Sequence, residues 1–218
     1  MNLLKFKILA LILLFGSMIQ AADTEKVEEF FADIRSDNIE SIKKIIANNK
    51  DIINSRDVTG NPPLALTASK GKLEIAKILI DAGADVNAKL SCNWTILMYL
   101  CGQSGFSENR LEIAKLLLNA GANVSDTTDY DESALNLASS RGLTELVTLL
   151  LANNADISHK NKEGENSYDL ALQSGYYGTA EVLKAWPEYM KELTKQKLDQ
   201  ENHLLPDLNQ IVAEYLFG

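Results

Sequence analysis

A sequence pattern that recurs at near-regular intervals dominates the middle of this chain. It occurs three times between residues 60 and 157, and a weaker fourth copy begins at Gly164. The copies align on one residue in each, namely Pro62, Thr95, Ser133 and Asn166. The steps between these residues are 33, 38 and 33, and a period of this length predicts a stacked repeat array rather than a domain with a single core.

Each copy contains two stretches with the features of short helices. Pro62 lacks an amide proton and Thr95 offers a hydroxyl cap, and both features suit the first turn of a helix. In the second stretch, apolar residues follow helical spacing. They are Ile75, Ile78 and Leu79 in one copy and Ile113, Leu116 and Leu117 in the next.

The ends of these stretches are also marked in the sequence. The second stretch ends at Gly83, Gly121 or Asn154, and these residue types readily adopt the left-handed conformation of a helix C-cap. A small residue recurs near the end of the first stretch, where it lets the two helices of a copy approach closely. This position is occupied by Ala68, Cys101 and Ser139.

With this period and two helices in each copy, residues 25–185 resemble the ankyrin-repeat family. The resemblance implies an all-α fold, an ankyrin-repeat solenoid of about five helix-turn-helix units with β-turn tips. The family's Thr-Pro-Leu-His signature appears here only as Pro-Pro-Leu-Ala, Thr-Ile-Leu-Met, Ser-Ala-Leu-Asn and Asn-Ser-Tyr-Asp. No unit keeps the histidine, so we expect its hydrogen bonds between neighbouring turns to be replaced or absent.

The repeat boundaries and the two chain ends divide the sequence into seven segments. We expect a signal peptide at 1–21, a diverged N-terminal ankyrin unit at 24–56, repeats at 57–89, 90–127 and 128–160, a degenerate C-terminal unit at 161–187, and a helical tail at 188–218. The 90–127 repeat has five extra residues, which lie within 102–110. This polar stretch with one Phe is either part of a binding site or a tolerated insertion.

The N-terminus has the layout of a secretory signal. Lys5 and Lys7 precede an apolar run over residues 8–15, and Ala21 is a small residue at the position for cleavage. The alternative, an uncleaved membrane anchor, is disfavoured because the run is far shorter than the ~20 residues that span a bilayer. We therefore expect export to a periplasm or out of the cell, and no membrane span after the signal is removed.

The C-terminal tail predicts one amphipathic helix. It begins at Pro206 and places Leu208, Ile211, Val212, Tyr215 and Leu216 on one face. The segment weakly resembles the Leu-Pro-helix opening of F-box-like tails on some viral and bacterial ankyrin proteins, which dock a ubiquitin-ligase adaptor. We favour the simpler interpretation, a helix that covers the last repeat or pairs with a partner.

The sequence contains none of the common motifs for catalysis, cofactor binding or metal binding. His159 and His203 have no ligand at zinc spacing, and phosphate-loop and nucleophile-elbow patterns are missing. Cys92 and Cys101 are expected to be free thiols. The net charge of −9 and the pI of about 4.8 also argue against a nucleic-acid binder. We therefore predict that the chain is not an enzyme and needs no cofactor or metal.

The resemblance implies a concave binding surface made by the turn tips and the exposed face of each first helix. Trp94 is the leading candidate for the dominant contact, since Trp, Tyr and Arg contribute most to interfaces; the alternative is that it packs on its own neighbouring turns. The expected partner-binding residues are Trp94, Tyr99, Tyr130, Asp57, Asn61, Asp131, Arg141 and Glu163.

The predicted function is an exported, monomeric, non-catalytic module that binds an unidentified protein. The alternative is a secreted effector whose tail recruits host ubiquitin-ligase machinery.

Overall fold

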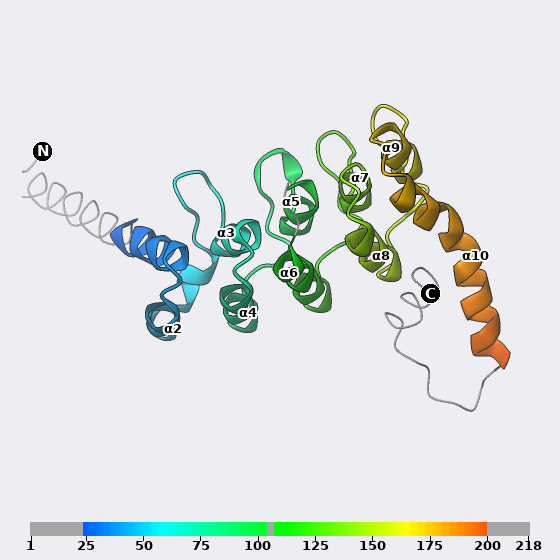
Figure 1. The fold of residues 1–218 in the computed structure, drawn as a ribbon. Coiled ribbons are helices and arrows are strands. Elements are labelled where there is room, and N and C mark those ends of the chain that lie inside the picture. The colour runs from blue at the N-terminus through cyan, green and yellow to red at the C-terminus, as the bar shows by residue number, and fades with distance from the viewer. Residues whose placement is uncertain (1–23, 104–106, 200–218) are drawn as a thin grey trace, which may run out of the picture. The chain divides into compact units, whose positions relative to one another are not determined.

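The computed structural model describes residues 24–103 and 107–199 (Figure 1). The chain divides at Asp85 into two compact units, which are described one after the other. The predicted signal peptide at 1–21, Phe106 of the insertion and the predicted tail helix after Pro206 lie outside the described residues. Among the helices in the described part, none is both long and apolar enough to cross a membrane.

The first unit consists of two helix pairs. Residues 24–35 are helical and pair with α2 (Ile39–Asn48); the 3₁₀ turn η1 (Lys50–Asn54) then leads to the pair α3 (Pro63–Lys70) and α4 (Leu73–Asp81) (Figure 1). The core of this unit contains fully buried Phe30, Phe31, Ile34 and Ile42. The Lys72 ammonium joins the two pairs, since it lies 2.6 Å from the Asp37 carboxylate and 3.2 Å from the Arg35 carbonyl oxygen.

The second unit consists of three helix pairs. They are α5 (Ile96–Gly102) with α6 (Glu108–Asn119), α7 (Ala134–Ser139) with α8 (Thr144–Ala152), and α9 (Ser167–Gln173) with α10 (Tyr177–Asp199). A short 3₁₀ turn, η2 (Ser91–Asn93), precedes α5. Helices α5, α7 and α9 form the upper row of this unit in the view of Figure 1, and α6 and α8 form a second row below it. The predicted all-α fold with about five helix-turn-helix units is therefore confirmed.

The helices begin and end at the residues that the sequence indicated. The Thr95 hydroxyl accepts a hydrogen bond from the Met98 amide at 3.2 Å and caps α5. Gly83, Gly121 and Asn154 have φ values of 97°, 88° and 64°, the left-handed conformation expected after a helix. In α3 the first helical residue is Pro63, one position after Pro62.

Side chains other than histidine take over the hydrogen bonds at the signature's fourth position. Asn136 Oδ1 accepts from the Ser133 amide at 3.1 Å, and Asp169 Oδ2 accepts from the Asn166 amide at 3.1 Å. Asn136 Nδ2 also donates to Ser167 Oγ at 3.3 Å, which links two neighbouring turns. In this part of the chain the histidine is replaced by a capping box, and at Asn136 also by a bond between repeats.

The position predicted to hold a small residue lies in the core. Ala68, Cys101 and Ser139 are all fully buried, as close contact between paired helices requires. Burial raises the pKa of the Cys101 thiol well above its ordinary value. Cys92 is exposed, and both cysteines are free.

The insertion is partly helical. Helix α6 begins at Glu108, three residues before Leu111, the counterpart of the first residue of α4. Three of the five extra residues therefore extend α6, instead of forming the polar loop expected from the sequence.

The boundary that we placed after Pro187 falls inside a helix. Helix α10 continues through Pro187 to Asp199, although proline removes one backbone hydrogen bond and crowds the preceding turn. The buried rings of Trp186 and Tyr189 flank the proline, with their centroids 5.5 Å apart. Their packing holds the helix together where local propensity alone predicts a break.

Candidate functional site

Four five-residue hairpins form the tips that precede the first helix of a pair. In each hairpin the amide of the first residue donates to the carbonyl of the fifth, and the fourth residue has a positive φ. The tips are residues 57–61 in the first unit and 90–94, 128–132 and 161–165 in the second. Their fourth residues are Gly60, Asn93, Asp131 and Gly164, types that tolerate this conformation.

Three of the tips are also closed by a side chain of their first residue. Asp57 Oδ1 accepts from the Asn61 amide at 3.0 Å, Thr128 Oγ1 from the Glu132 amide at 3.2 Å, and Asn161 Oδ1 from the Glu165 amide at 2.9 Å. The 90–94 tip begins with Leu90, whose side chain has no acceptor. Both Cys92 and Asn93 adopt a positive φ in this tip, so its backbone differs from that of the other three.

The tip of the first unit uses its polar groups internally. Asp57 Oδ1 also accepts from the Thr59 hydroxyl at 2.6 Å, and Asn61 Nδ2 donates to that hydroxyl oxygen at 2.8 Å. Burial raises the pKa of Asp57, but the hydrogen bonds from Thr59 and Asn61 outweigh it and hold the pKa below its ordinary value. The predicted binding residues Asp57 and Asn61 therefore stabilise their own turn.

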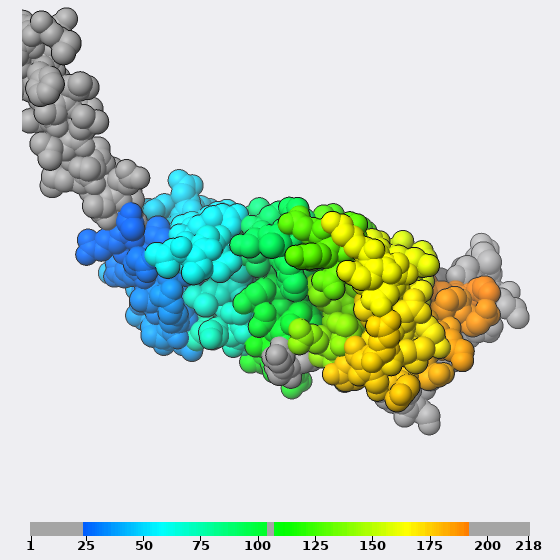
Figure 2. All heavy atoms as spheres, turned by 90° about the horizontal axis from the view of Figure 1, so that it is seen from above, coloured from blue at the N-terminus to red at the C-terminus, as the bar shows by residue number. Residues whose placement is uncertain are grey.

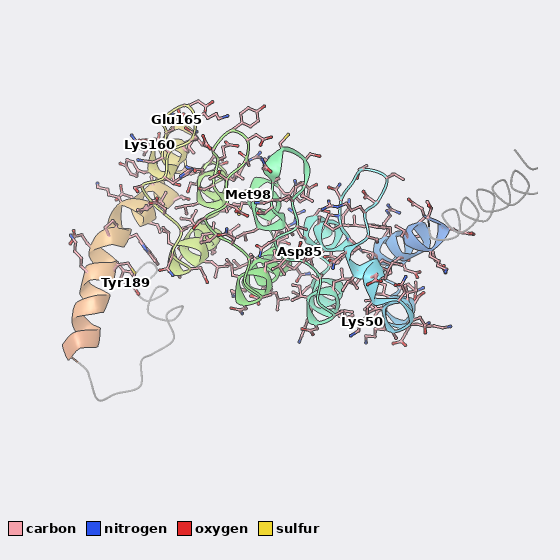
Figure 3. The ribbon with its side chains drawn as sticks, turned by 180° about the vertical axis from the view of Figure 1, so that it is seen from behind. Lys50, Asp85, Met98, Lys160, Glu165 and Tyr189 are labelled. Atoms are coloured by element: carbon pink, nitrogen blue, oxygen red, sulfur yellow. The ribbon has the colours of Figure 1, made fainter. Side chains whose placement is uncertain are left out.

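The three tips of the second unit are joined into one row. The Asp129 amide donates to the Cys92 carbonyl at 3.2 Å, and the Lys162 amide donates to the Tyr130 carbonyl at 3.2 Å. Asn93 Nδ2 also donates to the Asp129 carboxylate at 2.5 Å. Figure 2 views this unit from the side of the tips, where its residues form a continuous surface. Figure 3 labels Glu165 at one end of this row of tips.

Tyr130 is the most prominent side chain of this row. It is 59% exposed, although large apolar side chains are normally buried. The neighbouring Asp131 is also exposed, and its carbonyl oxygen lies 2.6 Å from His159 Nε2. The backbone of the tip is thus held from both sides, while the phenol ring of Tyr130 projects into solvent.

A charged cluster lies beside Tyr130. Burial raises the pKa of Glu132, the Glu163 carboxylate raises it further, and the Arg141 guanidinium opposes both effects. Arg141 and Glu163 are exposed, while Glu132 is half-buried. The structure therefore brings Tyr130, Asp131, Arg141 and Glu163 into one part of the second unit.

Glu132 is the residue of this cluster that was not among the expected binding residues. Nothing local in the sequence shows that its carboxyl group is half-buried and senses the charges of Arg141 and Glu163. Its position as the fifth residue of a tip could have marked it as a candidate binding residue, because this residue leads directly into the first helix of the pair.

The two remaining predicted residues are less accessible. Trp94 and Tyr99 are both partly buried. The indole of Trp94 lies against the end of its own helix, where a Cβ added to Gly102 would be 2.7 Å from the ring. This contact corresponds to the alternative interpretation of Trp94, and part of the side chain remains exposed.

No three His, Cys, Asp or Glu side chains in the described ranges converge as metal ligands do. The groups that converge on the row of tips are an aromatic ring, carboxylates and a guanidinium, which form non-covalent contacts with another macromolecule.

Two overlapping parts of the chain, residues 30–128 and 103–195, match a family model described as ankyrin repeats in three copies. Together they cover most of the chain and include at least part of each of the five helix pairs.

Several curated proteins share part of this sequence. The tyrosine-protein kinase HTK16 of Hydra vulgaris is 26% identical over 187 residues, which are 83% of this chain and 24% of the kinase. The ankyrin repeat and KH domain-containing protein mask-1 of Caenorhabditis elegans is 31% identical over 144 residues, which are 66% of this chain and 4% of that protein. A probable E3 ubiquitin-protein ligase of Oryza sativa, XBOS33, is 38% identical over 94 residues, or 42% of this chain and 17% of the ligase.

The chain thus spans about a quarter or less of the length of each of these relatives. The similarity is limited to the repeats and does not extend over the whole length of any of these relatives.

Proposed function

Because this chain belongs to the ankyrin-repeat family, we propose that it is a non-catalytic module whose second unit binds a partner protein through its row of tips. Ankyrin repeats indicate a protein–protein interaction module, and their tips and first helices provide an extended surface for binding. The proposed contact surface consists of Tyr130, Asp131, Glu132, Arg141 and Glu163.

The exposure of Tyr130 is the observation that best supports this surface. A tyrosine that is 59% exposed on a tip with a hydrogen-bonded backbone offers a large contact area with little conformational entropy to lose on binding. The cluster of Glu132, Arg141 and Glu163 beside it would select a partner by charge. Trp94 has a smaller role in this proposal, since its ring packs on Gly102.

The proposed site of action is outside the cytoplasm. The basic residues, apolar run and small residue of segment 1–21 favour export and cleavage after Ala21. The mature protein would then act as a monomer in a periplasm or outside the cell, with a protein rather than a nucleic acid as its partner.

Site-specific photo-cross-linking tests the proposed surface. A photoreactive residue at position 130 should capture a protein in the producing organism, and the same residue at position 145 should not. Glu145 is a suitable control because it is exposed on α8, a second helix of a pair. Capture of the same protein from position 145 alone would place the interface on the other row of helices and contradict the proposal.

The captured protein then allows a quantitative comparison. Tyr130→Ala should weaken its binding about tenfold or more, as expected for a dominant interface residue, and Glu145→Ala should change it less than twofold. Equal effects of the two substitutions would contradict the role of Tyr130.

Export is tested separately. Cell fractionation followed by N-terminal sequencing should yield a chain that begins at Ala22. An unprocessed chain in the cytoplasm would contradict the export proposal without affecting the proposed surface.

A further inference from the structure

The last helix pair of the second unit exposes large side chains at positions where the preceding pair has smaller and less exposed residues. Leu172 in α9 is 38% exposed, whereas its counterpart 33 residues earlier, Ser139, is fully buried. Tyr177, the first residue of α10, is 69% exposed. Its counterpart Thr144 is only partly exposed.

Hydrogen bonds of the α7–α8 pair show which of its side chains face the following pair. In the α7–α8 pair, the Asn136 amide group is bonded to Ser167 and the Thr144 hydroxyl lies 2.8 Å from the Thr179 hydroxyl. Both contacts join the pair to the one that follows it. By the same geometry, Tyr177 in the last pair faces the place where a further pair would stack.

We define the open end of the repeat array by Tyr168, Leu172 and Tyr177. Tyr168 belongs to this group because it is partly exposed while its counterpart Leu135 is buried. A terminal repeat normally presents a polar outer face to water. Two tyrosines and a leucine do not meet that requirement, so the open end is an apolar surface that needs a cover.

The rest of the chain supplies a segment suited to cover this surface. The described part ends at Asp199, and residues 200–218 follow. That stretch is rich in large apolar residues, namely Leu204, Leu205, Leu208, Ile211, Val212, Tyr215, Leu216 and Phe217. Five of them, from Leu208 to Leu216, share one face of the helix that the sequence predicts.

The segment is long enough to reach the open end. Helix α10 runs from Tyr177 to Asp199, which at 1.5 Å per residue is about 33 Å. An extended linker of residues 200–205 spans about 20 Å, and a helix over 206–216 adds about 16 Å. A short linker of this kind keeps the segment at an effective concentration in the millimolar range, which favours it over a second copy of the chain.

We propose that residues 204–216 pack their apolar face on the open end and act as the cap of the repeat array. This arrangement buries the exposed side chains of the open end and the apolar face of the predicted tail helix against each other. A tail bound in this way would not be available to recruit another protein, so the proposal also favours the capping interpretation of the tail over an adaptor-docking one. It does not depend on the proposed surface around Tyr130.

Hydrogen exchange on the full-length chain provides the test. Ile211→Glu places a charge on the predicted apolar face and should accelerate amide exchange in α9 at least tenfold. Gln210→Glu is the matched control, because it adds the same charge on the polar face and should change exchange less than twofold. Unchanged exchange in the Ile211→Glu variant, or equal acceleration by both substitutions, would overturn the proposal.

A cross-link gives a second measurement that does not depend on stability. With Cys92→Ser and Cys101→Ala as background, a chain carrying Leu172→Cys and Val212→Cys should form a disulfide within one molecule under mild oxidation. A chain carrying Leu172→Cys and Gln210→Cys should not, because residue 210 lies on the opposite face of the predicted helix. A disulfide that forms only between two molecules would show that a second copy covers the open end, and this result would overturn the proposal.

Discussion

The α7–α8 pair and the α9–α10 pair have the same local design, yet one is enclosed by neighbours and the other ends the described array. Asn136 and Asp169 occupy equivalent positions, and each accepts a hydrogen bond from the amide of its helix cap residue at 3.1 Å. Asn136 is fully buried and also bonds Ser133 Oγ and Ser167 Oγ. Asp169 is only partly buried.

The comparison separates two kinds of interaction in a repeat protein. The capping bond is local, so it recurs wherever the sequence places a suitable side chain at the third residue of the helix. The bond to the next turn requires a neighbouring pair and therefore exists only at inner positions. Residues at equivalent positions of different repeats should thus differ in their contribution to stability, and four sets of substitutions test how position in the array affects it.

The largest difference is expected at the capping position. Asn136→Leu would remove the buried side-chain acceptor of the Ser133 amide and hydroxyl and the donor to the Ser167 hydroxyl. It should lower the free energy of unfolding by about 3 kcal/mol. Asp169→Leu removes a half-exposed cap and should cost about 1 kcal/mol. Urea unfolding followed by circular dichroism measures both, and equal losses would contradict the role of the Ser167 contact.

A smaller difference is expected at two glycines in the same repeat position. Gly142 and Gly175 have φ values of 66° and 79°, so alanine is strained at both. At Gly142 the added Cβ would also lie 2.2 Å from the Tyr176 ring, whereas at Gly175 no atom lies within 4 Å. Gly142→Ala should therefore cost about 2 kcal/mol and Gly175→Ala about 1 kcal/mol. A Gly175→Ala variant that loses as much stability as Gly142→Ala would show that strain, rather than the tyrosine contact, is decisive.

A gain in stability is expected at the small-residue position. The hydroxyl of Ser139 is fully buried and has no hydrogen-bond partner in the described part of the chain. Ser139→Ala should raise the free energy of unfolding by about 1 kcal/mol, because it removes an unsatisfied polar group. The control Ser174→Ala, at an exposed position after α9, should leave the urea midpoint unchanged. A loss of stability in Ser139→Ala would show that the hydroxyl has a partner in solution.

The smallest effect is expected at the tips and depends on pH. Burial first, and the Glu163 carboxylate second, raise the pKa of Glu132 above its ordinary value of 4.5. The folded state therefore disfavours the ionised form. The resulting loss of stability develops as the pH rises above 4.5 and disappears at lower pH. Glu132→Gln should be slightly more stable than the parent chain at pH 7 and equal to it at pH 3.

The control for this prediction is Glu145→Gln on the exposed face of α8, which should show no such pH dependence. Carboxyl titration by NMR provides a direct measurement. The Glu132 pKa should fall in Glu163→Gln and rise in Arg141→Gln, and a shift in the opposite direction in either variant would contradict the proposed cluster.

Much of the fold could be predicted because its signals are local. The cap at Thr95 and the left-handed residue at Gly83 depend on hydroxyl chemistry and backbone sterics within a few residues. The continuation of α10 through Pro187 could not be predicted, because it depends on the packing of Trp186 and Tyr189. The helical extension of α6 also escaped prediction, since polar residues such as Glu108 and Asn109 show no apolar periodicity.

The candidate surface was predictable in outline. Counting along the repeat placed Tyr130, Asp131 and Glu163 on tips, where the structure has them. It could not show that Trp94 packs on Gly102 or that the carboxyl group of Glu132 lies near the charges of Arg141 and Glu163. Both features depend on the directions in which side chains point, and the repeat period gives no information about these directions.

The amino-acid sequence by itself determined the period, the helix pairs and their caps, because each of these follows from interactions within about thirty residues. Only the tertiary structure decided which equivalent positions are enclosed. Ser139 is fully buried in the α7–α8 pair, whereas Leu172 at the equivalent position of the α9–α10 pair is 38% exposed. Neighbouring pairs determine burial in a repeat array, so the repeat period alone does not show which positions are enclosed.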